Sequence, residues 1–477
     1  MALNIGIGDI GYENQWYLQG FDPTSVPAQR PETAQADSVT VFDTEPFGAP
    51  GRVLRIGDQV VYGVTAPSTL PFVGSEINYF TVLSNWNTIK NVLITSDTAE
   101  QVQVNGAVHV DVALNATTTD DSYVSLLGLK RGNIVTGNGD DLVYIETLNN
   151  NDGWVSEIRM TLNEGNDTVQ IRDLSENRLT EDPYKNLNIS QGFNTDGEGQ
   201  KVFADLGEGD DTFDGAGSNA TFDVRGFNAN DLIVGGNNDD NLAGDRGNDT
   251  LYGGYGDDVI DTGYEAATTE EIALERSVYT ALQNNAMTPE LLQAFYDAAE
   301  YGDGGHGTDA LFSFGKWNSE MVVDGMDVLQ GYKGGDYFYF VGEFGTDVVN
   351  DFVGGARVSD PEVNQGDRLM YENVTTGNNS LFTFQTVNFD GGSNDLLISW
   401  GYNGEASGLN AEQGASDRAV IVKDFFTLNT GVIDTSGYAG TKTVAQLEAL
   451  GANNIFNFSV SDHAEIRTEY NFFGGLV

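Results

Sequence analysis

The residues of this sequence best suited to chemistry are aspartates that recur every nine positions. Residues 226–261 divide without a gap into four nonapeptides, each beginning with glycine and carrying an aliphatic residue at its eighth position. The sixth position is aspartate in every repeat: Asp231, Asp240, Asp249 and Asp258. A fixed period of this kind indicates a repeat architecture, in which each copy forms the same local structure.

The pattern predicts a calcium site in each pair of stacked turns. Glycine allows a tight turn to adopt positive φ and to expose backbone carbonyls. Two nonapeptides make a coil of about 18 residues, so turns two repeats apart should face one another. We therefore expect Asp231 to pair with Asp249, and Asp240 with Asp258. Two carboxylates and several carbonyls form an oxygen cage suited to Ca²⁺ at about 2.3–2.6 Å, whereas Mg²⁺ demands a tighter octahedron.

The predicted ligand set extends beyond the tandem. After an interruption the nonapeptides resume in phase, with Asp309, Asn318, Asp327 and Asp336 at the sixth position. Single copies occur earlier around Asp141, Asp167 and Asp211, where an ordinary Gly/Asp turn is an equally good interpretation. Glycines expected to shape the turns and offer carbonyls are Gly235, Gly244, Gly247, Gly253, Gly256, Gly304 and Gly307.

One turn of the tandem departs from the pattern. Ala229 replaces the fourth-position glycine, and alanine tolerates the left-handed conformation poorly. We therefore expect a weaker site at this turn.

The segment 226–339 resembles the calcium-binding β-roll of the repeats-in-toxin family, whose consensus is Gly-Gly-x-Gly-x-Asp-x-U-x. Residues 345–352 and 366–370 resemble the segment that often follows such rolls, and residues 395–401 and 417–426 resemble a C-terminal domain of the same secreted proteins. The resemblance implies several bound Ca²⁺ ions and export by a type I machine that reads an uncleaved C-terminal signal. The apolar tail Asn471–Val477 is similar to the ends of many such signals.

Composition narrows the classes of partner and compartment. The chain has 72 acidic and 22 basic residues, a net charge of −50, which opposes a compact state and disfavours nucleic acid and anionic membranes. It has no cysteine, hence no disulfide or thiolate metal site. It contains no apolar run long enough to cross a membrane and no N-terminal Sec signal. We expect a secreted, extracellular or cell-surface protein without membrane insertion.

The predicted fold is all-β: a parallel β-roll or β-solenoid with calcium-binding nonapeptides, an inserted helical hairpin and flanking irregular β domains. Short strand-like runs separated by Gly, Asn and Asp support this class. The expected divisions are 1–85, an N-terminal β region; 86–225, an irregular β-solenoid; 226–263, the calcium-binding β-roll; 264–303, the helical hairpin; 304–370, the second part of the roll and a cap; and 371–477, a C-terminal β domain with the secretion signal.

The hairpin is predicted from capping signals. Residues 268–271, Thr-Thr-Glu-Glu, form a capping box, and Leu274, Val278 and Leu282 follow on one face. Pro289 opens a second helix and Gly302 is placed to end it. Because the repeat frame resumes afterwards, we expect the hairpin to project from the solenoid and to be dispensable for calcium binding.

No catalytic motif accompanies the repeats. The sequence lacks His-Glu-x-x-His and Gly-x-Ser-x-Gly, and its three histidines, His109, His306 and His463, are far apart. The prediction is a non-enzymatic structural protein, such as a surface-layer, matrix, filament or adhesin subunit, whose partners are further copies of itself and, as a second class, a cell-surface glycan. The alternatives are a secreted polysaccharide-active enzyme (lyase, epimerase or hydrolase) on a β-helix, and a glycan-binding module.

Overall fold

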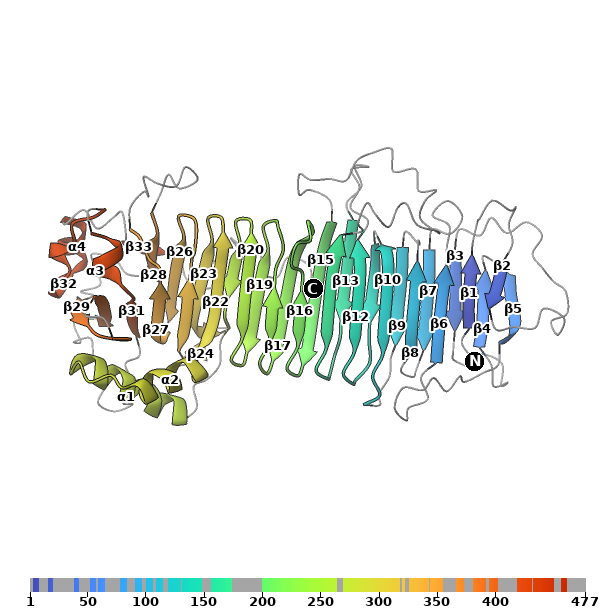
Figure 1. Cartoon of the computed structure of the whole chain (residues 1–477), viewed down its shortest axis with the longest axis horizontal. Helices are drawn as coiled ribbons and strands as arrows, with labels where there is room; N and C mark the ends of the chain where they lie inside the picture. The colour runs from blue at the N-terminus through green and yellow to red at the C-terminus, as the bar shows by residue number, and fades with distance from the viewer. Residues whose placement is uncertain are drawn as a thin grey trace. The chain divides into compact units, whose positions relative to one another are not determined.

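Figure 1 draws the computed structural model of the chain. The chain has two compact units, Met1–Arg225 (unit 1) and Gly226–Val477 (unit 2). The residues that it describes are 3–7, 16–19, 38–42, 52–56, 59–64, 78–83, 91–96, 100–105, 109–114, 119–129, 131–147, 156–173, 200–263, 269–317, 320–321, 326–342, 344–354, 366–372, 381–391, 394–401, 418–430, 432–449 and 456–460.

Unit 1 contains two mainly parallel sheets. The first pairs β1, β6, β8, β10, β12, β14 and β16 in parallel, with β2 antiparallel to β1. Their bounds are Leu3–Ile7 (β1), Trp16–Gln19 (β2), Asn78–Leu83 (β6), Glu100–Asn105 (β8), Tyr123–Leu129 (β10), Leu142–Thr147 (β12), Thr168–Asp173 (β14) and Thr212–Asp214 (β16).

The second sheet of unit 1 pairs β3, β7, β9, β11, β13 and β15 in parallel, with β4 and β5 added antiparallel. Their bounds are Ser38–Phe42 (β3), Arg52–Ile56 (β4), Gln59–Val64 (β5), Asn91–Ser96 (β7), His109–Leu114 (β9), Arg131–Val135 (β11), Ser156–Thr161 (β13) and Gln200–Glu208 (β15). From β6 to β16 successive strands alternate between the sheets, so each coil supplies one strand to each. This is the arrangement of a parallel solenoid.

Unit 2 repeats this alternation and adds an antiparallel end. Its first sheet is parallel from β18 through β20, β22, β25 and β27 to β31, and then continues antiparallel through β30 and β29 to β32. The bounds are Leu232–Val234 (β18), Thr250–Tyr255 (β20), Glu300–His306 (β22), Asp327–Gln330 (β25), Gly345–Asn350 (β27), Arg418–Val422 (β31), Asp395–Gly401 (β30), Leu381–Val387 (β29) and Gly440–Thr443 (β32).

The second sheet of unit 2 is parallel through β19, β21, β23, β26, β28 and β33, and β24 is antiparallel to β23. The bounds are Asn241–Arg246 (β19), Val259–Asp261 (β21), Ala310–Trp317 (β23), Glu320–Met321 (β24), Tyr337–Gly342 (β26), Arg368–Glu372 (β28) and Phe456–Val460 (β33); β17, Thr221–Asn228, spans the division between the units. The short helices are α3 (Phe425–Leu428), a 3₁₀ turn (Thr435–Gly437) and α4 (Val444–Ala449).

The expected all-β, parallel, solenoid-like architecture is therefore confirmed at the level of the sheets. The eighth-position residues of the tandem, Ile233, Leu242, Leu251 and Ile260, are fully buried, as their inward orientation requires. Aliphatic side chains stacked at one position of successive coils make a continuous core between the two sheets.

Two helices interrupt the strands of unit 2. They are α1 (Thr269–Gln283) and α2 (Pro289–Ala298). Thr288 caps α2, because its hydroxyl accepts a hydrogen bond from the backbone N–H of Leu291 at 3.2 Å. The helix ends at Ala298 and not near Gly302, because β22 already begins at Glu300.

The hairpin was expected to project from the solenoid, but one face of it packs against strands of unit 2. That it is dispensable for calcium binding stays a prediction. Val278, Tyr279, Leu282 and Phe295 are buried in one apolar cluster with residues of β25, β27, β30 and β31. Two polar contacts join α1 to the same strands: the Tyr279 hydroxyl lies 3.0 Å from Ser399 Oγ, and Thr346 Oγ1 donates to Glu275 Oε1 at 2.7 Å. Figure 1 shows both helices next to β27 and β29. The hairpin thus joins the roll to the antiparallel strands.

Truncation of the hairpin's central side chain should destabilise unit 2 strongly. Because Phe295 is fully buried against the cluster, we expect Phe295→Ala to lower the free energy of unfolding by about 3–5 kcal/mol. Denaturant unfolding in saturating calcium measures the change. The exposed Glu290→Ala on the same helix is the control, with an expected change within about 0.5 kcal/mol. Equal effects of the two substitutions would show that the hairpin is not docked.

Candidate metal centre: stacked turns with buried aspartates

The largest group of candidate ligands is a column of five aspartates in unit 2, here called the long column: Asp240, Asp258, Asp309, Asp336 and Asp367. Each directly precedes a strand of the second sheet and is at most 5% exposed. The backbone N–H of each donates to Oδ1 of the next, at 2.8, 2.9, 3.0 and 3.2 Å in chain order. Each aspartate thereby bridges two neighbouring coils.

A second set of aspartates precedes strands of the first sheet. In unit 2 the Asp231 N–H donates to Asp249 Oδ1 at 2.8 Å, so the predicted stacking of Asp231 on Asp249 and of Asp240 on Asp258 is confirmed. In unit 1 the Asp141 N–H donates to Asp167 Oδ1 at 2.7 Å, and the Asp167 N–H to Asp211 Oδ1 at 2.6 Å. The three copies that are single in the sequence therefore form their own column.

The predicted frame after the hairpin needs a correction. Asp309 stacks on Asp336, 27 residues later, so this coil is one nonapeptide longer than a regular coil. Asp327 belongs instead with the aspartates of the first sheet, and its N–H donates to Asp347 Oδ1 at 3.1 Å. Asn318 falls within the additional nonapeptide and lies outside the described residues.

The first-position glycines make room for the aspartates of their own turns. A Cβ built on Gly253 would overlap Asp258 Oδ2 and would lie 2.6 Å from the carbonyl oxygen of Gly304 in the next coil. The carboxylate and the carbonyl of a neighbouring turn thus converge on one point. The same crowding by the turn's own aspartate occurs at Gly235, Gly244, Gly304 and Gly331.

The fourth-position glycines allow the coils to approach closely. Gly247 has φ of +133°, and a Cβ on it would overlap the carbonyl oxygen of Ala229 in the preceding coil; Gly256 and Gly307 meet the preceding backbone similarly. Ala229 itself has φ of +81°, so the strain expected at this turn is present.

Gly247→Ala should therefore destabilise the roll more than an alanine at an open glycine with positive φ. Gly391 is the matched control, because it has φ of +112° and nothing would lie within 4 Å of its Cβ. We expect a loss of about 1–2 kcal/mol for Gly391→Ala from backbone strain alone, and about 2–5 kcal/mol for Gly247→Ala, which adds overpacking. Denaturant unfolding at saturating calcium compares them, and a smaller loss at Gly247 would contradict the stacking of these turns.

Some of the aspartates in these turns have one carboxylate oxygen that is buried without a hydrogen bond. Within the described part of the chain such oxygens include Oδ2 of Asp258 and Asp309, as well as of Asp141, Asp167 and Asp327. Desolvation raises the pKa of Asp258 to about 9, with Asp240 and Asp309 contributing repulsion, and raises that of Asp309 to about 7. A buried carboxylate without a partner is costly, so these oxygens suit a cation.

The donor set suits Ca²⁺ better than a metal bound mainly by side chains. Among the residues that the structure describes, no group of three or more His, Cys, Asp or Glu side chains is arranged to hold a metal. The turns instead offer one or two carboxylates together with carbonyls such as that of Gly304, and calcium accepts such mixed oxygen ligands.

A second ladder of polar side chains accompanies the aspartates, and the sequence analysis missed it. Fifth-position Asn and Asp side chains accept from the same position of the next coil: Asp257 N–H donates to Asp239 Oδ1 at 2.9 Å, and Thr308 N–H to Asp257 Oδ1 at 2.8 Å. The signal was visible, because the fifth position of all four tandem repeats is Asn or Asp. This exposed ladder runs opposite in direction to the buried one.

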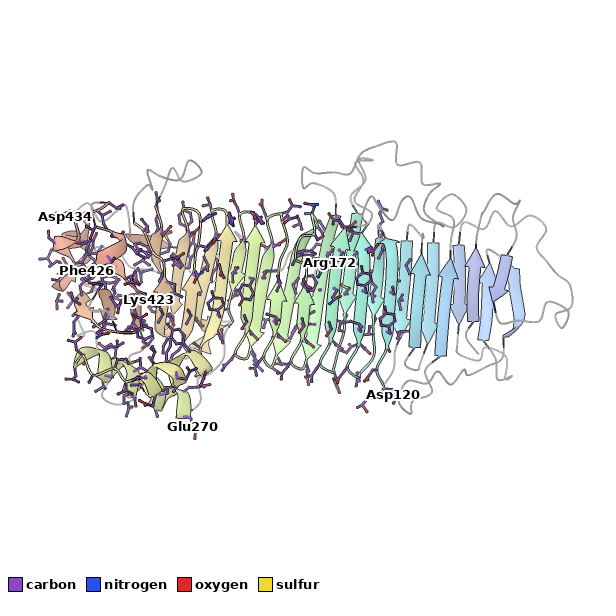
Figure 2. All side chains as sticks on the ribbon, in the orientation of Figure 1. Asp120, Arg172, Glu270, Lys423, Phe426 and Asp434 are labelled. Atoms are coloured by element: carbon purple, nitrogen blue, oxygen red, sulfur yellow. The ribbon has the colours of Figure 1, made fainter. Side chains whose placement is uncertain are left out.

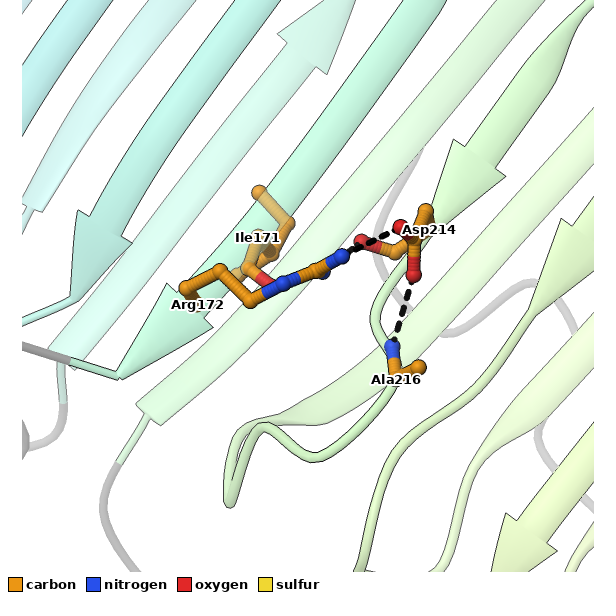
Figure 3. Close-up of polar contacts among 4 residues, drawn as sticks. All are labelled: Ile171, Arg172, Asp214 and Ala216. Atoms are coloured by element: carbon orange, nitrogen blue, oxygen red, sulfur yellow. Dashed lines mark hydrogen bonds and ion pairs between the residues drawn. The ribbon is translucent and has the colours of Figure 1, made fainter.

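Two ion pairs involve carboxylates outside the columns. In unit 1, Arg172 pairs with the Asp214 carboxylate and donates to the Asp214 carbonyl at 2.7 Å, while Asp214 Oδ1 accepts from Ala216 N–H at 3.1 Å (Figure 3). In unit 2, Lys423, labelled in Figure 2, lies 2.7 Å from Asp390 Oδ2. These basic side chains neutralise aspartates outside the columns.

The structure describes the surroundings of one histidine side chain, that of His306, which lies among aromatic rings. The His306 ring stacks on Tyr255, with centroids 4.5 Å apart, and lies 5.5 Å from the ring of Tyr332. His463 and the side chain of His109 lie outside the described residues. The described imidazole thus has a packing role.

Comparison with protein-family models and with curated proteins finds no match to this chain. In the described ranges, no helix is both long and apolar enough to cross a membrane.

Proposed function

We propose that this chain is a secreted, calcium-binding structural protein of the repeats-in-toxin type that assembles at or outside the cell surface. The observation that carries the proposal is the long column, in which five buried aspartates bridge successive coils. Ionised carboxylates in such a column would repel one another, and a row of bound cations would neutralise them.

Asp240, Asp258, Asp309 and Asp336 would hold calcium in the long column, with carbonyls of first-position residues such as Gly304. Asp231 and Asp249 would do so in the first-sheet turns, and Asp141, Asp167 and Asp211 in unit 1. Bound calcium would supply positive charge and cross-link neighbouring turns. The chain's own contribution is to hold the carboxylates apart from water in a fixed register.

Self-assembly is supported by strand edges. β5 pairs with β4, and β33 pairs with β28, and each is the last strand of its sheet among the described residues. An exposed strand edge can pair with another chain. Folding outside the cell, where calcium is millimolar, would create these edges only after export.

Electron microscopy and light scattering of the purified full chain, with and without calcium, test the assembly. We expect ordered filaments or sheets in millimolar calcium and dispersed chains in chelator. A compact monomer that persists at millimolar calcium and high protein concentration would contradict the assembly, although calcium binding itself would stand.

Glycan binding is the second candidate function. It is favoured by exposed tyrosines, Tyr252 and Tyr255 of β20 and Tyr332 just after β25, since aromatic side chains offer apolar faces beside a polar hydroxyl. Retention on immobilised neutral polysaccharide, weakened by Tyr255→Ala, would support it. Turnover of such a polymer would favour the polysaccharide-active enzyme.

A further inference from the structure

The helical hairpin is inserted inside one of the stacked turns that precede strands of the first sheet of unit 2. β22 pairs with β20 in a register that places Tyr301 opposite Thr250. Glu300 therefore lies at the position equivalent to Asp249, as the sixth residue of the next turn of the first-sheet series. Glu300 is 5% exposed and is followed in register by Asp327 of β25.

The other end of the hairpin also occupies turn positions. A Cβ on Gly244 would overlap both Asp249 Oδ2 and the carbonyl oxygen of Thr262. The Thr262 carbonyl thus has the same position relative to Asp249 as the Gly304 carbonyl has relative to Asp258. Gly263 has φ of +149°, and its Cβ would lie 2.7 Å from the Asp245 carbonyl oxygen and 3.1 Å from Glu300 Oε2. Thr262, Gly263 and Glu300 are therefore the first, second and sixth residues of a turn whose middle has been replaced by two helices.

The far end of the hairpin is fixed by packing. Its buried side chains, including Tyr279 and Phe295, share an apolar cluster with Val348 of β27, Leu397 of β30 and Ala419 of β31. The base of the hairpin, formed by Thr262, Gly263 and Glu300, thus lies among the stacked turns. The two helices cover the junction between the parallel and antiparallel strands. An ion bound at the base would affect how firmly the two helices pack on these strands.

We propose that Asp249 and the hairpin base, through the Thr262 carbonyl and the Glu300 carboxylate, form a calcium site of their own, and that its occupancy fixes the hairpin on the C-terminal strands. The inference rests on the proposed calcium binding by the regular turns. It adds two residues outside the nonapeptide pattern, Thr262 and Glu300, to the ligands, and it makes the hairpin a calcium-dependent clasp. Without the ion, two acidic groups at the base repel one another and favour release of the helices.

The absence of cysteine provides a direct test. Ala419→Cys places one thiol in the cluster beneath the hairpin, here called the clasp reporter, and Ala310→Cys in β23 places one in the roll, here called the roll reporter; both alanines are at most 5% exposed. The rate of thiol modification is measured during a calcium titration of the full chain. Glu300→Gln is introduced into each reporter, and Glu290→Gln, an exposed carboxylate on the hairpin, is the matched control.

We expect Glu300→Gln to raise the calcium concentration that protects the clasp reporter by about tenfold, because one charged ligand is lost, while the protection of the roll reporter changes by less than about twofold. Glu290→Gln should shift neither. An unchanged midpoint for the clasp reporter, with both thiols still protected by calcium, would overturn the clasp alone. If calcium protected neither thiol in the parent reporters, the proposed calcium binding would fail as well. Equal shifts of both thiols would indicate loss of the whole roll and would also overturn the clasp.

Discussion

Chelation of calcium at neutral pH is expected to unfold the aspartate-bearing turns and most of the β structure that they align. Extracellular calcium modules commonly have Kd of about 10⁻⁴–10⁻³ M. At ten times such a Kd, each site contributes about 1.4 kcal/mol, so several sites together rival the whole stability of a domain. Circular dichroism before and after addition of chelator measures the loss. An unchanged spectrum and melting temperature would contradict the stabilising role of calcium.

Acidification should partly replace calcium. Burial raises the pKa of Asp258 to about 9 and of Asp309 to about 7, above the roughly 3.9 of an unfolded aspartate. Between these values the folded, calcium-free chain binds more protons than the unfolded chain. The stability that these two carboxyl groups contribute is therefore fully present below the unfolded pKa and is lost as the pH rises through the folded pKa.

In chelator, lowering the pH from 8 to 5 should thus raise the free energy of unfolding and restore β structure. Circular dichroism across this range measures the effect. Greater stability of the calcium-free chain at pH 8 than at pH 5 would contradict the burial of these carboxylates.

Asp309→Ala should have the largest effect of any single substitution in the long column. Asp309 is fully buried; it accepts the Asp258 N–H at 2.9 Å and donates its own N–H to Asp336 at 3.0 Å. Its removal leaves a buried donor without a partner and takes a carboxylate from the turns on either side. We expect a loss of about 3–5 kcal/mol in saturating calcium and of at least one bound ion.

Asp257→Ala is the matched control for Asp309→Ala. Asp257 is exposed, and it accepts the Thr308 N–H at 2.8 Å in the outer ladder. Loss of this exposed hydrogen bond should cost about 1 kcal/mol without a change in calcium stoichiometry. Denaturant unfolding of both variants measures the loss of stability, and calorimetric titration measures the number of calcium ions bound. Similar losses would mean that the buried ladder carries no ions.

The pairing of turns could be predicted from the sequence because the tandem has no gaps. A period of nine, with two repeats per coil, is enough to place Asp231 beside Asp249 and Asp240 beside Asp258. The unit 1 column was not recognisable because its coils vary in length: Asp141 and Asp167 are 26 residues apart, and Asp167 and Asp211 are 44 apart. Loops of different length leave the stacking intact but remove the sequence period.

The role of the hairpin could not be predicted for a different reason. Its apolar face was visible in Val278 and Leu282, but the strands that cover this face come later in the sequence. Tyr279 meets Ser399, 120 residues away, and Glu275 meets Thr346, 71 residues away. Helical periodicity shows that a face must be buried without showing against what. Glu300 was missed because glutamate does not match the sixth-position aspartate of the repeat.

Calorimetric titration of the full chain with Ca²⁺ at neutral pH, repeated with Mg²⁺, tests the central claim most directly. The stacked aspartates predict several Ca²⁺ ions per chain, with Kd below about 10⁻³ M and much weaker binding of Mg²⁺, which requires a tighter octahedral cage. A chain that remains folded and shows no saturable binding of calcium would contradict the account.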